Sequence, residues 1–196
     1  GSGTVTGISV GGLPDGVVDA GTLATDSVDS AELIDGSIDT AHIAADQITS
    51  AILPAGSVLQ VVVGTDSSAT TIATTTYTDV GLSATITPSA TSSKILVMWN
   101  SQVNFTAASN GFGVKLLRGS TAVYTSGELW ETYQQAAASG TLDNRPGRSN
   151  WIYLDSPSST SAIVYKVQHA TDGGRSCIFN NPVGTITQIV LMEIGA

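Results

Sequence analysis

Aliphatic residues recur at every fifth position through the first third of the chain. They are Leu13, Val18, Leu23, Val28, Leu33, Ile38, Ile43, Ile48, Leu53 and Val58. A helix turns by about 500° over five residues, and an odd step along a strand alternates faces, so neither structure gathers these side chains on one side. Repeats that cannot bury their apolar residues alone do so by stacking or association. The spacing therefore predicts a slender shaft of three parallel chains over residues 13–55, with these side chains packed along the trimer axis.

The repeat resolves further into units of ten residues, in which two local patterns alternate. Each Ser/Thr-Ala-x-Leu/Ile motif is typical of a hydroxyl N-cap that opens a single helical turn. Each Ser-Val/Ile-Asp motif favours a short extended piece. The competing interpretation is disorder, because the segment is acidic, weakly hydrophobic and lacks aromatic residues. The unbroken spacing over all ten positions favours the ordered shaft.

From residue 57 onward the pattern changes to β-rich runs separated by turn signals of Gly, Pro, Asn, Asp and Ser. Strands are predicted over residues 57–63, 71–78, 82–87, 94–103, 111–118, 122–126, 149–154, 162–169, 175–179 and 185–194. So many short strands indicate a mainly β fold, an antiparallel jelly-roll-like β-sandwich head preceded by the repeat-containing shaft. The segment 128–146 breaks the pattern, and we expect either a long loop or a short helix around residues 131–138.

The order of strands and turns also predicts which connections lie at which end of the head. We assume that the chain enters and leaves the head at the shaft and that strand directions alternate. The turns that would then point away from the shaft lie near Asp66, Pro88, Gly119, Pro157 and Asn181. The segments 106–110, 128–146 and 170–174 would point back toward the shaft. A ligand held by segment 128–146 would then contact the flank of the head or the groove between neighbouring subunits.

Composition divides the chain in the same place as the hydrophobic pattern. The formal net charge is −9, yet residues 1–56 hold eight acidic residues and no Lys or Arg, whereas the remainder is close to neutral. All aromatic residues also lie after residue 56. We therefore predict three regions: an N-terminal attachment segment or tag remnant at 1–12, the shaft at 13–55 and the head at 56–196.

Several classes of function are disfavoured by the same composition. An acidic chain without a basic patch is not expected to bind nucleic acid, because phosphate neutralisation requires Lys and Arg. The sequence has no run of 18 apolar residues, so we expect no membrane insertion. No phosphate-binding glycine loop, zinc-ligand spacing or nucleophile elbow occurs, which predicts no cofactor, no metal site, no catalytic residue and no enzymatic activity. Cys177 is the only cysteine, and we expect a small core residue there.

A few residues would nevertheless suit catalysis in the right surroundings. His42 falls at a variable position of the repeat, where we expect a solvated surface residue. His169 precedes a turn signal and would need a neighbouring nucleophile or carboxylate. The carboxylates that would supply a glycosidase pair are Glu128, Glu131, Asp143 and Asp155. Four loop carboxylates are the expected background in an acidic protein, so the non-catalytic interpretation is preferred.

The segment 128–146 and the strand after it carry the residues best suited to bind a ligand. The candidate binding residues are Trp130, Tyr133, Gln134, Asp143, Asn144 and Arg145, with Trp151 nearby. Aromatic rings stack on sugar faces while amides and carboxylates bond to hydroxyl groups, so the set suits a glycan. In the competing interpretation Trp151 belongs to the core and Trp130 or Tyr133 covers a trimer interface.

An ordered set of motifs carries a resemblance to a known class of protein. The motifs are "ADQITSAILPAGSVLQVVVGT", "SATITPSATSSKILVMW", "GVKLLRGSTAVY", "WIYLDSPSSTSAIVYKVQ" and "ITQIVLMEIGA". Together with the ten-residue repeat they resemble the C-terminal part of bacteriophage virion fibre proteins of the kind common in marine phages. The resemblance spans nearly the whole chain and implies a homotrimeric appendage with a β-sandwich head. It implies no particular receptor, because such heads differ in what they bind.

The resemblance and the patterns together predict a structural fibre protein of a phage virion. Its expected partners are two further copies of itself, other virion proteins through the N-terminus, and host-surface polysaccharide through the head. The expected location is the surface of the phage particle, which becomes extracellular after release. Two non-catalytic alternatives stay open: a capsid- or neck-decorating fibre without a receptor role, and a carbohydrate-binding module of a secreted bacterial protein. A depolymerase is the enzymatic alternative.

Overall fold

The computed structural model describes residues 33, 38–39, 41–45, 47–49, 52–105, 110–127, 132–134, 146–172, 176–180 and 186–196. The chain divides into two compact units, Gly1–Thr49 and Ser50–Ala196. The described part of the second unit is built from β-strands. They are β1 (Val58–Asp66), β2 (Thr70–Ile72), β3 (Thr78–Ile86), β4 (Lys94–Phe105), β5 (Asn110–Arg118), β6 (Thr121–Thr125), β7 (Thr132–Gln134), β8 (Pro146–Asp155), β9 (Ile163–Thr171), β10 (Cys177–Phe179) and β11 (Thr187–Ile194).

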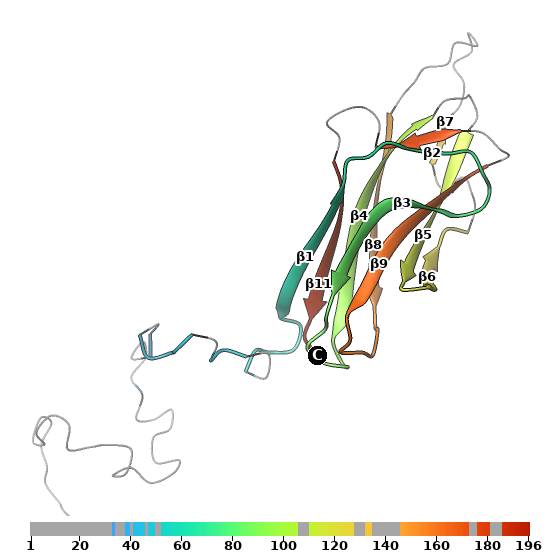
Figure 1. The fold of residues 1–196 in the computed structure, drawn as a ribbon. Coiled ribbons are helices and arrows are strands. Elements are labelled where there is room, and N and C mark those ends of the chain that lie inside the picture. Colours follow the sequence, from blue (N-terminus) through green and yellow to red (C-terminus); the bar gives the residue numbers. More distant parts are fainter. Residues whose placement is uncertain are drawn as a thin grey trace, which may run out of the picture. The chain divides into compact units, whose positions relative to one another are not determined.

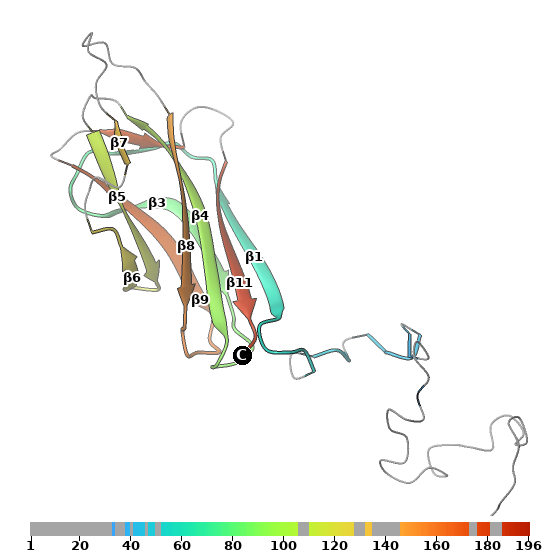
Figure 2. The ribbon, with the colours of Figure 1, turned by 180° about the vertical axis from the view of Figure 1, so that it is seen from behind.

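The strands form two antiparallel sheets (Figure 1). In the six-stranded sheet β4 is central: β8 pairs with it along one edge, and β11 and β10 share the other edge. β1 then pairs with β11, and β2 with β10. Viewed from behind, β8, β4, β11 and β1 lie side by side (Figure 2). The five-stranded sheet has the order β3-β9-β5-β6, with β7 also paired to β5.

The inner faces of the two sheets bury one continuous core. Alternate residues of facing strands supply it, among them Leu82, Val97, Leu116, Tyr165 and Leu191. The period of two along each strand produces this arrangement, because successive side chains point to opposite faces of a sheet. Burying each large aliphatic side chain contributes about 1.5–3 kcal/mol. The mainly β, sandwich-like fold predicted from the sequence is confirmed, and most strands fall close to the predicted ranges. The predicted strand over residues 71–78 is wrong, because β2 ends at Ile72 and β3 begins at Thr78.

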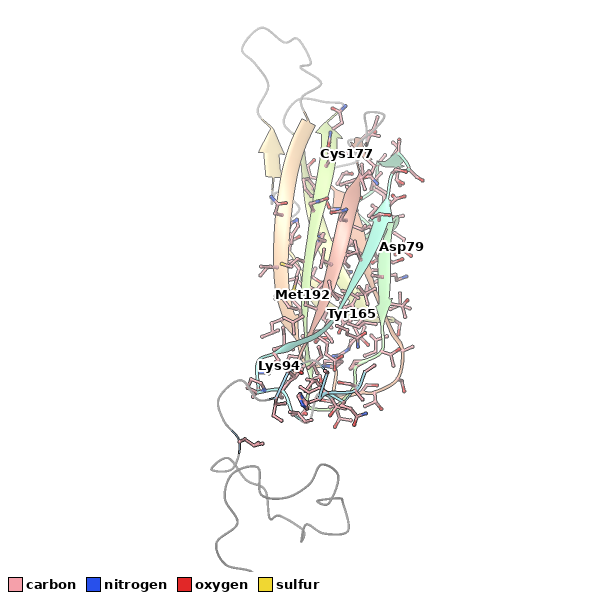
Figure 3. All side chains as sticks on the ribbon, turned by 90° about the vertical axis from the view of Figure 1, so that its left-hand side faces the viewer. Asp79, Lys94, Tyr165, Cys177 and Met192 are labelled. Carbon is pink, nitrogen blue, oxygen red and sulfur yellow. The ribbon has the colours of Figure 1, made fainter. Side chains whose placement is uncertain are left out.

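The chain enters and leaves the sandwich at the same end, which we call the near end. The backbone N–H of Gly56 donates to the carbonyl of Gly195 at 2.7 Å, and the Gly195 N–H donates to Ser57 at 2.9 Å. At the opposite, far end the Asn180 side-chain amide donates to the Asp66 carboxylate at 2.7 Å. In Figure 3 the near end holds Lys94, and Cys177 lies toward the far end.

The predicted placement of the connections is wrong except around Asp66 and residue 180. The turn after β3 lies at the near end, where the Thr87 carbonyl accepts a hydrogen bond from Gln60. The turns at residues 119–120 and 156–162 lie there too, because Gly119 bonds to Val164 and Arg118 reaches the Ser156 carbonyl. The connections after β4, β6 and β9 leave from the far end. The error arose at β2, which is a three-residue strand and does not cross the sandwich, so the predicted strands from β3 to β10 run opposite to expectation. β11 again runs as expected, from the far end to the near end.

Candidate functional site

Little of the predicted glycan site falls within the described residues. Outside them lie Trp130, Asp143, Asn144 and Arg145. Tyr133 and Gln134 belong to β7, which pairs with the start of β5. The sequence left open a loop or a helix here, and the structure places a short strand. The glycan site stays a prediction, but its segment now starts and ends at the far end of the sandwich, since β8 begins opposite Asn104.

Trp151 lies on the inner side of the six-stranded sheet. It stands opposite Trp99 in the β4–β8 register, and the two rings stack with centroids 6.1 Å apart. The Tyr124 ring of the other sheet packs against both indoles, at 6.4 Å from Trp99 and 5.9 Å from Trp151. The Trp151 ring thus packs against the core, as the competing interpretation of the sequence supposed, and is no longer a candidate for glycan binding.

The repeat exposes its aliphatic residues in the single chain. Leu13, Val18, Leu23 and Val28 lie outside the described residues. The described members are 37–52% exposed, and they are Leu33, Ile38, Ile43, Ile48, Leu53 and Val58. Such regular exposure is what a repeat has before its partners are added, and packing along a trimer axis stays a prediction.

One turn of the repeat is described in detail. The His42 N–H donates to the Asp39 carbonyl at 3.0 Å, and the Asp39 carboxylate accepts the Ala41 N–H at 2.9 Å. The sequence predicted a hydroxyl cap from Thr40, which lies outside the described residues; the hydrogen bond observed here is accepted by the preceding aspartate. Hydrogen bonds from Ala41 and His42 hold the pKa of Asp39 below its usual value. His42 is a surface residue, as expected, with its ring 2.9 Å from the Asp39 carboxylate.

Asp155 is part of a buried ion pair that joins the two sheets. Its carboxylate accepts from the Arg118 guanidinium at 3.0 and 3.1 Å and from the Tyr165 hydroxyl at 2.6 Å. Burial, and secondly the Asp155 carboxylate, raise the pKa of Tyr165. The Asp155 carboxylate is thus buried and engaged in contacts within the sandwich. The other carboxylates considered for a glycosidase pair, Glu128, Glu131 and Asp143, lie outside the described residues.

His169 makes a pair with Ser101 that would resemble a nucleophile and its base in an open site. The Ser101 hydroxyl lies 3.0 Å from Nε2, and the Gly113 carbonyl lies 3.3 Å from Nδ1. Both residues are buried, and the Phe179 ring stacks on the imidazole at 4.1 Å. Burial lowers the pKa of His169 to about 3. The pair is therefore a neutral part of the core, closed to substrate.

Two further residues with reactive or ionisable side chains, Glu193 and Cys177, lie in the interior. Glu193 is fully buried and accepts from the Ser89 N–H at 2.7 Å, the Ser89 hydroxyl at 2.6 Å and the Gln60 amide. Burial raises the pKa of Glu193, but the hydrogen bonds outweigh it and the net pKa is lowered. Cys177 is buried in the core, as expected. Among the described residues no three His, Cys, Asp or Glu side chains gather closely enough to hold a metal, and no helix could cross a membrane.

The outer side of the six-stranded sheet is the most unusual surface in the described part of the chain. Two complete rows of apolar residues cross β1, β11, β4 and β8. These four strands lie side by side in Figure 2. The rows, which we call the outer apolar face, are Val63-Val190-Met98-Ile152 and Val61-Met192-Leu96-Leu154. Ile152 is 69% exposed, and three others exceed half. Val58 and Ile194 extend the face toward the near end.

A shallow groove of about 340 Å³ crosses the face where its apolar part meets a row of amides. Met98, Ile152 and Val190 line its apolar side, and Asn100, Asn150 and Gln188 line the other. The Asn100 side chain already accepts the Gln188 N–H at 3.1 Å. No charged side chain lines the groove. Its chemistry suits the apolar side chain of another protein better than an ionic ligand.

This face was not among the sites predicted from the sequence. A signal was present in the uninterrupted apolar runs "ILVMW", "VVV" and "IVLM". A strand with one solvated face alternates apolar and polar residues, whereas an uninterrupted run indicates that both faces are covered. The strand "TDVGLSATI" of β3 alternates, and its outer residues are exposed.

Comparison with known proteins gives limited information. No family model matches the chain, and no curated protein matches it. Among solved structures the chain is similar to a mutant VP2 protein of infectious bursal disease virus in derived T=1 particles, with 15% identity and a TM-score of 0.38. It is also similar to the structure of the Gx strain of that virus, with 16% identity and a TM-score of 0.36.

Both matches are partial. The chain is covered over 68% and 71% of its length, but it spans only 36% and 39% of those chains. Similarity at this level describes a general likeness of β architecture and carries no conclusion about activity or partners.

Proposed function

We propose that this chain is a structural protein of a phage virion: a homotrimeric fibre with a shaft at 13–55 and a head at 56–196. The observation that carries the proposal is the line of exposed aliphatic residues at five-residue spacing, which a single chain leaves in water. The ordered motifs that resemble phage fibre proteins support the same assignment. The proposed location is the particle surface, with other virion proteins bound through the N-terminal segment.

We further propose that the head is a jelly roll. Its principal strands in chain order are β1, β3, β4, β5, β6, β8, β9 and β11. The first, eighth, third and sixth lie together in one sheet, and the second, seventh, fourth and fifth in the other. This division of eight strands is the one that two nested Greek keys produce. The short strands β2, β7 and β10 extend the far half.

For the head we propose a non-catalytic role in attachment to host-surface polysaccharide. The segment between β6 and β8 carries the aromatic and amide residues suited to sugars. In support, the strands that flank it place its two ends at the far end of the sandwich, away from Gly56. A decorating fibre without a receptor, or a carbohydrate-binding module of a secreted protein, are the alternatives that the following experiments separate.

The trimer is tested by sedimentation of the full chain and two variants. We expect three chains per particle. Ile38→Asp would bring three unpaired charges together at the axis, where burial is heavily penalised, and should dissociate or shorten the ordered shaft. Ala45→Asp adds the same charge at an exposed repeat position and should leave the trimer intact. A monomeric wild-type chain would contradict the fibre assignment and favour the binding-module alternative.

Attachment is tested by adsorption of the purified protein to host cells. Trp130→Ala with Tyr133→Ala should reduce binding by at least about tenfold, if stacking of a sugar face on each ring contributes as much as the stacking of a base on an aromatic ring, about 1–3 kcal/mol. The control is Thr160→Ala with Ser161→Ala, two exposed residues of the near-end turn. Wild-type protein that binds no cell surface would support the decorating fibre. Release of soluble sugar from host polysaccharide would instead indicate a depolymerase.

A further inference from the structure

The outer apolar face needs a partner that its own sandwich does not provide. Eight residues in two rows across four strands carry no charge, although the chain as a whole has a net charge of −9. Four of the eight, Val61, Val63, Ile152 and Leu154, are more than half exposed, and a contiguous exposed apolar patch of this kind marks an interaction site. Lys94 borders the face at the near end, opposite Ile194. Among the described paired residues it is the charged residue nearest to the rows on this side of the sheet.

We propose that the outer apolar face is where the heads of three chains pack against one another, a proposal that rests on the trimeric fibre. Identical surfaces that meet in a homo-oligomer bring like charges close together, which opposes contact. On an acidic chain an acid-free face is therefore the surface on which copies approach each other at the least electrostatic cost. An acidic or basic partner would require charges that this face lacks.

The position of the face along the chain points to the same occupant. The five-residue series of aliphatics continues through Leu53 to Val58, which is the first residue of β1. Val58 lies opposite Ile194, and the series is followed on the same side of β1 by Val61 and Val63. In the sequence, the five-residue series of the repeat thus leads directly into β1 and its apolar residues. Copies aligned by the repeat would meet next at this face.

The extent of the face also fits an interface between copies. The two rows, extended by Val58 and Ile194 and by the groove beside Ile152, cross four adjacent strands of one sheet, which is the breadth of an interface rather than of a single pocket. The amides Asn100, Asn150 and Gln188 form a polar border on the far side, as interface rims commonly do.

Cysteine labelling of the full chain tests this proposal. Ile152→Cys places a thiol on the face, and Val164→Cys places one on the outer side of the five-stranded sheet, where Val164 pairs with Thr85. In an isolated chain Ile152→Cys should react with a maleimide at least as fast, since Ile152 is 69% exposed and Val164 is 42% exposed. Between packed heads Ile152→Cys should react at least about tenfold more slowly than Val164→Cys, because interface cores are as densely packed as interiors. The buried Cys177 of the wild type supplies the background rate.

Sedimentation of the same samples separates the outcomes. A trimer in which Ile152→Cys is protected and Val164→Cys reacts supports the proposal. A trimer in which both react overturns it while leaving the fibre intact. A monomer overturns the fibre and this inference together, and protection that persists in a monomer would mean that the chain covers its own face. If Ile152→Cys impairs assembly, Val61→Cys gives the second reading with the same expectations.

Discussion

The two outer sides of the sandwich differ as much as a surface and an interior. On the five-stranded sheet the outer side is mostly polar, with Val164 as an exposed exception, and Asp79 accepts from Lys166 at 2.8 Å and from Gln168 at 2.6 Å. The outer residues of β3 that follow are polar or small as well, such as Ser83 and Thr85. On the six-stranded sheet two full rows are aliphatic or methionine. Both sheets bury the same kind of inner face.

The difference shows that strand alternation does not by itself separate inside from outside. Alternation assigns residues to two sides of a sheet, but what covers each side decides which residues are stable there. The polar side needs only water. The apolar side is stable in solution when something apolar covers it, and the proposed packing of three heads would supply that cover.

The largest expected effect comes from forcing the two sheets apart. At Gly64 the backbones of β1 and β3 approach so closely that an added Cβ would lie 2.0 Å from the Ser83 carbonyl oxygen. Gly64→Ala should lower the free energy of unfolding by about 4 kcal/mol or more, in the range of severe core disruptions. Denaturant unfolding measures it. Gly127→Ala is the matched control, since its Cβ would meet nothing within 4 Å, and an equal loss in both would refute the close approach.

Placing a charge on each outer side tests the contrast directly. Leu154→Asp puts a carboxylate in the outer apolar face, where burial between copies without a partner should cost about 3 kcal/mol or more. Val164→Asp places the same group on the polar side and should change stability by less than about 0.5 kcal/mol. Thermal unfolding at two protein concentrations is the measurement. Equal midpoints for the two variants would mean that both sides face water.

Acid should weaken the interior that both sheets share. His169 has a pKa of about 3 in the folded chain against an ordinary value of 6.5, so only the unfolded chain takes up a proton between these values. The contribution of His169 to stability should therefore fall as the pH drops from 6.5 toward 3, by at most about 1.4 kcal/mol per pH unit. His169→Gln should flatten the dependence between pH 6.5 and 5. Protonation of Glu193 does not mask the effect of His169 in this range, because the pKa of Glu193 is lowered from its ordinary value of 4.5 in the folded chain.

The smallest expected effect is on the polar side. The hydrogen bond from Lys166 is the chief reason why the pKa of Asp79 lies below its usual value. Asp79→Asn removes the negative charge that faces Lys166. The pair is partly exposed, so the loss should stay below about 1 kcal/mol and vanish in roughly 1 M salt. Unfolding at low and high salt measures it. A loss of several kcal/mol would show that this side, too, is buried in the working protein.

The strands could be predicted from the sequence because hydrophobic alternation and turn residues are local signals. β4 and β9 fall within two residues of their predicted ranges. The direction of the connections could not be predicted, because it depends on whether β2 crosses the sandwich. That choice is made by its pairing with β10, more than a hundred residues later in the chain.

Sites were harder to predict than strands for a related reason. The sequence drew attention to aromatic and amide residues such as Trp151, which the structure stacks on Trp99 inside the sandwich. The outer apolar face is made of ordinary aliphatic residues, and only the register of four strands brings Val63, Val190, Met98 and Ile152 into one row. Composition carries no trace of such a register.

The pairing of Gly56 with Gly195 has a mechanical consequence. A tension applied through the residues before β1 and resisted at the far end acts along β1, parallel to its long axis. The ladder between β1 and β11 continues from Val58 to Asp66, so its hydrogen bonds are loaded in shear and share the force. A strand pulled sideways would instead lose its bonds one at a time. The head is thus arranged to withstand a pull along its length.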